Sequence, residues 1–180
     1  MQLIKLLEVS NLYGNDMKPV RAGNEHMKTH QKLPKVFVIG AGGGHLTESM
    51  CAVKGVKMDR IIITFKLPHT DELLKNEKRY YLIDPHKSLW KFVINGFQSL
   101  YIVVKERPKA IINTGGGISI ATSLLGKIFG AKLIYVESGA RVSTPSKTGK
   151  FLYKYADLFI VQWKPVLKHF PGAVYGGPLL

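Results

Sequence analysis

The sequence has little cysteine, few acidic residues and no long uninterrupted apolar run. Its single cysteine, Cys51, excludes an internal disulfide, which is typical of a reducing compartment. Only 12 acidic residues stand against 26 lysines and arginines, and the resulting charge of +14 indicates an anionic partner such as a membrane surface, a phosphorylated substrate or nucleic acid. No apolar run approaches the roughly 20 residues that cross a bilayer. We therefore expect a cytosolic protein, or one attached peripherally to the cytoplasmic side of a membrane.

What the sequence does contain is a series of short apolar segments separated by helical patterns. With 180 residues and 46% hydrophobic content, the chain can form one domain with a substantial core. Runs rich in β-branched residues predict strands at 36–39, 60–65, 79–84, 109–114, 132–137, 157–162 and 173–175. Strands that alternate with helices are typical of a parallel sheet. We predict a Rossmann-like α/β domain with helices on both faces over 35–180, preceded by a basic, loosely ordered arm over 1–34.

Two turns of three consecutive glycines each lie between a predicted strand and a predicted helix. Gly42, Gly43 and Gly44 follow the first strand, and Gly115, Gly116 and Gly117 follow the fourth. Backbone N–H groups at such a turn carry partial positive charge where a helix begins, so they can receive a phosphate or another anion. His45, at the rim of the first turn, can exchange a proton near neutral pH. Parallel strands open their carboxyl ends onto one edge, and we expect both turns there.

The fifth predicted strand adds three polar side chains to the same edge. It ends in Glu137 and Ser138, with Arg141 three residues further on. An acid, a hydroxyl and a guanidinium can together bind or activate a polar substrate. A structural role is also open: Glu137 and Arg141 can pair with each other, and Ser138 can cap a turn.

The helix predicted over 88–105 is apolar almost all the way round. Its narrow polar strip includes Lys91 and Asn95, whereas a helix on a sheet needs only one apolar stripe. Two interpretations follow. Either the helix is deeply buried, or part of it faces a lipid interface or a partner, in which case Trp90, Lys91 and Phe97 are the expected membrane-facing residues.

Several familiar chemistries fit the sequence poorly. His45 occupies the third glycine position of a dinucleotide fingerprint, so no nucleotide cofactor is expected. Ser119 lies in a near match to the nucleophile turn of α/β-hydrolases, and an unfavoured alternative makes Asp157 and His169 its partners. Histidines and carboxylates lack metal-ligand spacing, and aromatic residues form no basic platform for nucleic acid. We expect no cofactor, no metal and no nucleic-acid partner.

An ordered series of motifs extends from about Lys35 to the C-terminus. The motifs are Gly42-Gly43-Gly44-His45, Thr114-Gly115-Gly116-Gly117, Tyr135-Val136-Glu137-Ser138 with Ala140-Arg141-Val142, Ser146-x-Thr148-Gly149-Lys150, Ala156-Asp157-x-Phe159-x-Val161-Gln162-Trp163 and Tyr175-Gly176-Gly177-Pro178. This series resembles the Alg-fourteen family. That family includes the membrane-recruiting subunit of the two-part N-acetylglucosaminyltransferase of lipid-linked oligosaccharide synthesis, and its bacterial relatives serve polysaccharide assembly.

The resemblance implies both a fold and a division of labour. The fold would be the N-terminal, acceptor-binding half of a glycosyltransferase-B enzyme similar to MurG. The donor-binding half would be a separate, Alg-thirteen-like chain that is recruited to the membrane. The tail over 174–180 is apolar and too short after Pro178 to form an element of its own, so we expect it to help dock that chain. The reaction would transfer N-acetylglucosamine or another hexose from a nucleotide sugar to a polyprenyl-pyrophosphate-linked acceptor.

Roles for the polar residues follow from that resemblance. The acceptor phosphates would lie at the two glycine turns, with Ser138 and Arg141 close by. His45 would be the general base for the acceptor hydroxyl. Glu137 would be an alternative base, or the group that orients His45. A second hypothesis is a non-catalytic scaffold that only docks the catalytic subunit on the membrane.

Overall fold

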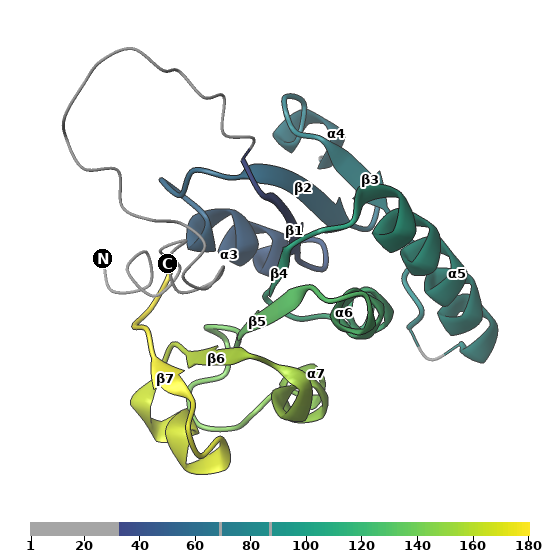
Figure 1. Cartoon of the computed structure of the whole chain (residues 1–180). Helices are drawn as coiled ribbons and strands as arrows, with labels where there is room; N and C mark the ends of the chain where they lie inside the picture. Colours follow the sequence, from purple (N-terminus) through teal and green to yellow (C-terminus); the bar gives the residue numbers. More distant parts are fainter. Residues whose placement is uncertain (1–32, 69, 87) are drawn as a thin grey trace, which may run out of the picture.

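The computed structural model describes residues 33–68, 70–86 and 88–180 (Figure 1). The arm expected over 1–34 lies outside these residues except for its last two, Leu33 and Pro34, which lead directly into the first strand. The domain boundary near residue 35 therefore stays a prediction.

In the described part of the chain, seven parallel strands form one sheet in the order β3-β2-β1-β4-β5-β6-β7. The strands are β1 (Lys35–Ile39), β2 (Asp59–Thr64), β3 (Arg79–Tyr81), β4 (Ala110–Asn113), β5 (Lys132–Val136), β6 (Leu158–Val161) and β7 (Val174–Tyr175). The chain adds β2 and β3 on one side of β1, then returns and adds β4 to β7 on the other. The direction of winding thus reverses between β1 and β4, where ligands of such sheets bind. The predicted Rossmann-like parallel sheet is confirmed.

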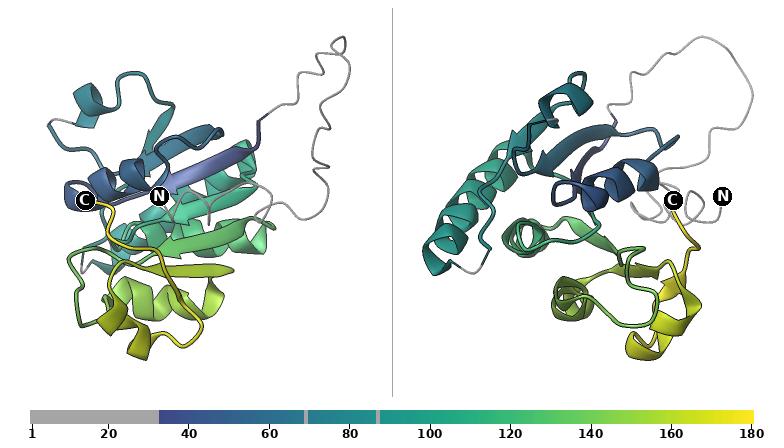
Figure 2. Two further views of the ribbon diagram at one scale, coloured as in Figure 1. Left: turned by 90° about the vertical axis from the view of Figure 1, so that its left-hand side faces the viewer. Right: turned by 180° about the vertical axis from the view of Figure 1, so that it is seen from behind.

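Helices cover both faces of the sheet, as the sequence predicts (Figures 1 and 2). They are α3 (Gly44–Ala52), α4 (Thr70–Leu73), α5 (Leu89–Glu106), α6 (Ser119–Ile128) and α7 (Lys147–Leu152), with 3-10 turns η2 (Tyr153–Tyr155) and η3 (Lys164–His169). Side chains of a strand alternate between the two faces. In β1, Val36 and Val38 pack on the side of α3, whereas Phe37 and Ile39 pack with residues of α5. Burial on both faces explains why the strands are continuous apolar runs.

A buried ion-pair cluster holds the end of α5 against the start of the sheet. The Glu106 carboxylate accepts hydrogen bonds from the Lys35 and Lys78 ammonium groups, both at 2.9 Å, and from the Tyr80 hydroxyl at 2.6 Å. Burial by itself raises the pKa of Glu106, but these three hydrogen bonds outweigh it and lower the pKa to about 2. Glu106 is therefore charged and fully partnered at neutral pH.

This cluster predicts a specific pH dependence of stability. A carboxyl whose folded pKa is lowered stabilises the protein above its unfolded pKa, and that contribution is lost as the pH falls toward the folded value of about 2. In urea unfolding, Glu106→Gln should lower the free energy of unfolding at pH 7 by an amount on the order of 3 kcal/mol, and much less near pH 2.5. Glu72→Gln, at an exposed position, is the control. Equal losses for Glu106→Gln at both pH values would contradict this account.

Candidate functional site

The two glycine turns lie side by side at the carboxyl edge of β1 and β4, as predicted. The Ala41 amide donates to the Gly115 carbonyl at 3.3 Å, and the Thr114 hydroxyl donates to the His45 carbonyl at 2.8 Å. Because β1 and β4 are direct neighbours, these bonds join the turns at the point where the winding of the sheet reverses.

Close packing of the turns explains why the second one needs glycine. Gly116 has a φ of +94°, a left-handed conformation that side chains rarely adopt, and a Cβ there would collide with the Cβ of Ala41. A larger residue would therefore push the turns apart. In the sequence, the only sign of this close packing is the run of glycines in each turn.

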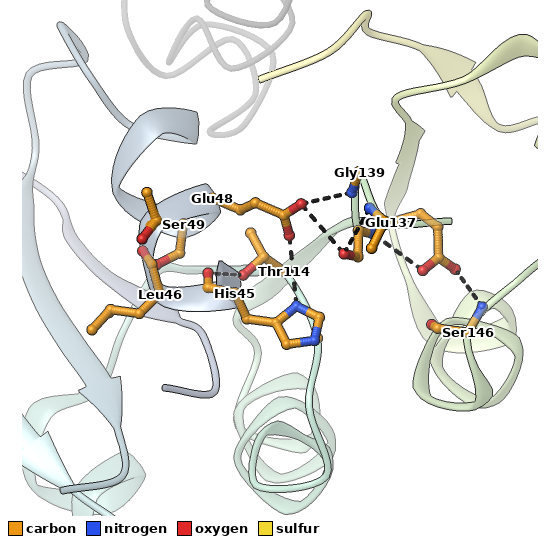
Figure 3. A network of polar contacts seen from close by, with 12 residues as sticks. His45, Leu46, Glu48, Ser49, Thr114, Glu137, Gly139 and Ser146 are labelled. Carbon is orange, nitrogen blue, oxygen red and sulfur yellow. Dashed lines mark hydrogen bonds and ion pairs between the residues drawn. The ribbon is translucent and has the colours of Figure 1, made fainter. Parts of the chain in front are cut away.

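His45 is in the first turn of α3, with its ring between Gly115 and Glu48 (Figure 3). Its Nδ1 lies 3.6 Å from Oε2 of Glu48, in a pair that is an ion pair whenever the imidazole is protonated. The side chain is 34% exposed, and no described residue hydrogen-bonds the other ring nitrogen, Nε2. His45 thus has one nitrogen turned to a carboxylate and one available to a ligand.

Glu48 lies beside His45 and is the residue of this site that the sequence analysis missed. Its side chain is only 6% exposed, and its Oε1 accepts hydrogen bonds from the Gly139 amide at 2.7 Å and the Ser138 hydroxyl at 3.3 Å. Burial raises the pKa of Glu48, but the interactions with His45, Gly139 and Ser138 together lower it below the ordinary value. The signal was present in the sequence, because residues three apart on a helix lie side by side.

Glu137 does not orient His45, contrary to one of the expectations above. Figure 3 shows its carboxylate turned away from His45, where it accepts hydrogen bonds from the amides of Ser146 at 3.3 Å and Ser138 at 3.1 Å. Gly149 packs so closely on this carboxylate that a Cβ would collide with it. Burial raises the pKa of Glu137. The geometry fits a carboxyl that holds the first turn of α7 onto β5; a catalytic role for it stays untested.

Ser138 and Arg141 belong to the loop that follows β5. Ser138 is buried and donates its hydroxyl to Glu48, so it supports the carboxylate beside His45. Arg141 is exposed, and within the described residues it forms no ion pair with Glu137. The alternative in which Arg141 pairs with Glu137 is therefore wrong, and the guanidinium is accessible at the edge of the sheet.

Two cavities open on either side of the first glycine turn. The first, of about 450 Å³, has His45 and Glu48 on one wall and Trp163, Pro178 and Leu180 opposite. The second, of about 580 Å³, is lined by Ala41, Asp84, His86 and Gly117. The edge of the sheet can therefore hold two different groups at once.

The hydrolase alternative is excluded by the positions of two of its residues, Ser119 and Asp157. The Ser119 hydroxyl is turned back to donate to the Gly116 carbonyl at 2.7 Å. Asp157 lies at the opposite end of the strands, where it pairs with Lys127 and accepts from the Leu133 amide. Nucleophile and acid are thus at opposite edges of the sheet and cannot form a triad. Elsewhere in the described chain, no group of three or more His, Cys, Asp or Glu side chains is placed to hold a metal ion.

Helix α5 has its polar side turned inward and its apolar side turned outward. Asn95 donates to the carbonyls of Ile83 and Ile118, and Ser99 shares a hydrogen bond with Thr122 of α6. The exposed side carries an apolar stripe formed by Trp90, Ile94, Phe97, Tyr101 and Val104. The interpretation of α5 as a deeply buried helix is therefore wrong: Trp90 is 77% and Phe97 70% exposed, and Lys91 is exposed beside them.

The apolar tail is only partly available to a partner. The Leu179 amide donates to Gln162 at 2.8 Å, and its side chain packs on the core beside α3. Leu180 is 75% exposed and borders the first cavity. Of the tail expected to dock the donor-binding chain, Leu179 therefore packs on this domain itself, whereas Leu180 is exposed.

The family described as "Oligosaccharide biosynthesis protein Alg14 like" matches residues 84–179, more than half of the sequence. The chain belongs to the Alg14 family. One relative is the human "UDP-N-acetylglucosamine transferase subunit ALG14", 26% identical over 84% of this chain and 86% of the human protein. Another is the subunit of the same name from Yarrowia lipolytica, 23% identical over 100% of this chain and 92% of that protein. The resemblance found in the motifs is confirmed.

Among solved structures, this Alg14 family member is similar to MurG of Acinetobacter baumannii. The TM-score is 0.66 at 16% sequence identity, over 81% of this chain. The chain spans 46% of the MurG chain, a little under half of it. The expected fold, that of the N-terminal domain of glycosyltransferase-B enzymes, is confirmed. None of the helices in the described ranges is long and apolar enough to cross a bilayer.

Proposed function

We propose that this chain is the acceptor-binding subunit of a two-chain glycosyltransferase. The enzyme transfers N-acetylglucosamine, or another hexose, from a nucleotide sugar to a polyprenyl-pyrophosphate-linked sugar. One observation carries the proposal: at the carboxyl edge of β1 and β4, His45 lines a cavity beside the first glycine turn, with its Nδ1 turned to the Glu48 carboxylate. Two further findings support it, the relatives named as transferase subunits and the likeness to rather less than half of a MurG chain.

The chemistry needs a base, an anion site and a separate donor. Nε2 of His45 accepts the proton of the acceptor hydroxyl as its oxygen attacks the anomeric carbon of the donor sugar. The nucleoside diphosphate leaves from that carbon and remains with the donor-binding chain. The amides of the glycine turns and the Arg141 guanidinium hold the acceptor phosphates, because they place positive charge around that edge. No step in this scheme requires a metal or a cofactor.

The start of α5 connects this edge to a membrane. The second cavity is lined by Asp84 and His86, just ahead of α5, together with Ala41 and Gly117 of the two turns. Leu89 and Trp90, at the first turn of α5, are 79% and 77% exposed. An acceptor whose phosphates lie at the turns can thus extend its prenyl chain along the apolar stripe of α5 into the bilayer. The chain would then be peripheral on the cytoplasmic side of the membrane.

The first cavity is the proposed docking position for the donor-binding chain, which the family resemblance describes as Alg-thirteen-like. Its outer wall is apolar, formed by Trp163, Pro178 and the exposed Leu180, while His45 lies on its inner wall. A partner seated there would bring its nucleotide sugar to the imidazole. Stable interfaces bury on the order of 1,600 Å² in total, so neighbouring loops must also take part.

The proposed division of labour predicts that the isolated chain is inactive. Because the donor site is assigned to another chain, calorimetric titration of the purified protein with UDP-N-acetylglucosamine should give no measurable binding below the millimolar range. Sugar transfer to a polyprenyl-pyrophosphate acceptor should be seen only after the donor-binding chain is added. Micromolar binding of the nucleotide sugar by this chain alone would overturn the proposal. The melting temperature of the same sample, measured by circular dichroism, shows whether the protein is folded.

A further inference from the structure

The two oxygens of the Glu48 carboxylate face different groups. Oε1 accepts hydrogen bonds from the Gly139 amide and the Ser138 hydroxyl, so its acceptor capacity is occupied. Oε2 faces only Nδ1 of His45, at 3.6 Å. Both of these atoms are buried, and neither has a hydrogen-bond partner within the described residues. A shift of a few tenths of an ångström would turn this contact into a hydrogen bond.

That geometry constrains where the imidazole carries its proton. A charged carboxylate oxygen can only accept, and leaving it buried without a donor is costly. The one donor within its reach is an N–H at Nδ1 of His45. Neutral His45 must then carry its proton on Nδ1, which leaves the lone pair on Nε2, the nitrogen that no described residue hydrogen-bonds. The backbone of His45 is fixed by the Thr114 hydroxyl, so the ring has a defined anchor.

We propose that Glu48 is the positioning residue of His45: its carboxylate, held by the Gly139 amide, fixes the Nδ1-protonated tautomer and so makes Nε2 the base. This inference rests on the proposed role of His45, although its effect on the tautomer can be measured without any reaction. Glu48 touches no substrate in this scheme and acts only through His45.

The remaining charged and titratable groups around His45 do not take over this task. From β5, Tyr135 approaches the same ring, but its hydroxyl is paired with Ser146 at 3.4 Å and burial raises the pKa of Tyr135. Glu137 faces the amides of Ser146 and Ser138. Arg141 lies on the exposed side of the following loop. Glu48 is the acceptor on the Nδ1 side.

The sharpest variant is Glu48→Gln, because the surroundings dictate how the amide must turn. The Gly139 amide can only donate, so the new amide oxygen takes that bond, and the NH₂ group is left facing Nδ1. An NH₂ donor needs a lone pair on Nδ1, so the proton should move to Nε2. Glu48→Gln should therefore reverse the tautomer, whereas Ser138→Ala, which removes a neighbouring bond to the same carboxylate, should leave the tautomer unchanged.

The experiment is nitrogen NMR of the full chain with labelled histidine. The sequence has 6 histidines, and the His45 signals are assigned as those missing from His45→Asn. The wild type should show a protonated Nδ1 and an unprotonated Nε2 above the titration of the ring. Glu48→Gln should show the reverse, and Glu48→Asp should retain the wild-type tautomer in part. A wild-type imidazole protonated on Nε2 would overturn the proposal, even if no Glu48 variant folded.

Activity in the reconstituted two-chain enzyme provides the second readout. With the wrong tautomer, kcat for Glu48→Gln should fall by about 10²-fold or more, with the KM for the acceptor little changed. A reversed tautomer with unchanged kcat would confirm the positioning role and refute His45 as the base. An unchanged tautomer in a folded Glu48→Gln variant would refute the positioning role itself.

Discussion

In the complete two-chain enzyme, His45→Asn is expected to lower kcat by about 10²- to 10⁴-fold, the usual contribution of a general base. The reason is local: His45 lines the first cavity, no described residue hydrogen-bonds its Nε2, and asparagine cannot take up a proton there. The half-exposed side chain makes no hydrogen bond that the fold depends on. Steady-state transfer to a polyprenyl-pyrophosphate acceptor, with copurification of the two chains, is the measurement.

His169→Asn is the matched control, because His169 is an exposed imidazole of η3 that contacts the Ser143 carbonyl at 3.1 Å. It should keep kcat within about twofold. If His45→Asn also retains full activity while the complex forms normally, the scaffold hypothesis becomes the better account: this chain would hold the catalytic subunit at the membrane without taking part in the chemistry. Loss of both activity and the complex would instead place His45 in the interface.

A double substitution in α5, Trp90→Asp with Phe97→Asp, is expected to release the protein from anionic vesicles. These two side chains lie seven residues apart on the exposed apolar stripe, and both face away from the sheet. Burial of each large apolar side chain contributes about 1.5–3 kcal/mol, so the partition coefficient should fall by about 10²-fold or more. Cosedimentation with phosphatidylserine-containing vesicles measures it, and the melting temperature should stay within a few degrees because neither side chain packs in the core.

Leu73→Asp is the control for this experiment, since Leu73 is 55% exposed but lies on α4, away from the stripe. It should bind vesicles like the wild type. The charge of +14 predicts in addition that binding falls with salt, at about 1 kcal/mol for each lysine or arginine near the surface. Undiminished binding of the double variant would contradict the hypothesis that the apolar stripe of α5 binds the membrane. Other exposed apolar residues, such as Ile128 and Phe129 at the end of α6, would then be the next candidates.

The sequence by itself determined the architecture and the place of the site. Short apolar runs rich in β-branched residues, such as Ile61–Ile63, predict strands buried on two faces, and strands that alternate with helices predict a parallel sheet. Two glycine turns at the ends of such strands necessarily open on one edge. That edge is where the structure places His45 and Arg141, because the direction of a parallel strand follows from the order of the chain.

Tertiary structure alone decided which side chains face one another. Glu48 lies three residues from His45 on α3, but only the tertiary structure brings the Gly139 amide and the Ser138 hydroxyl to its carboxylate. Glu137 ends β5, two strands from β1, and Gly149 lets α7 cover its carboxylate. For α5, the spacing of apolar residues predicts a helix but does not determine which side of that helix packs against the sheet. Asn95 and Ser99 are buried because they find partners at Ile83 and on α6, outside the helix itself, and this leaves the apolar stripe exposed.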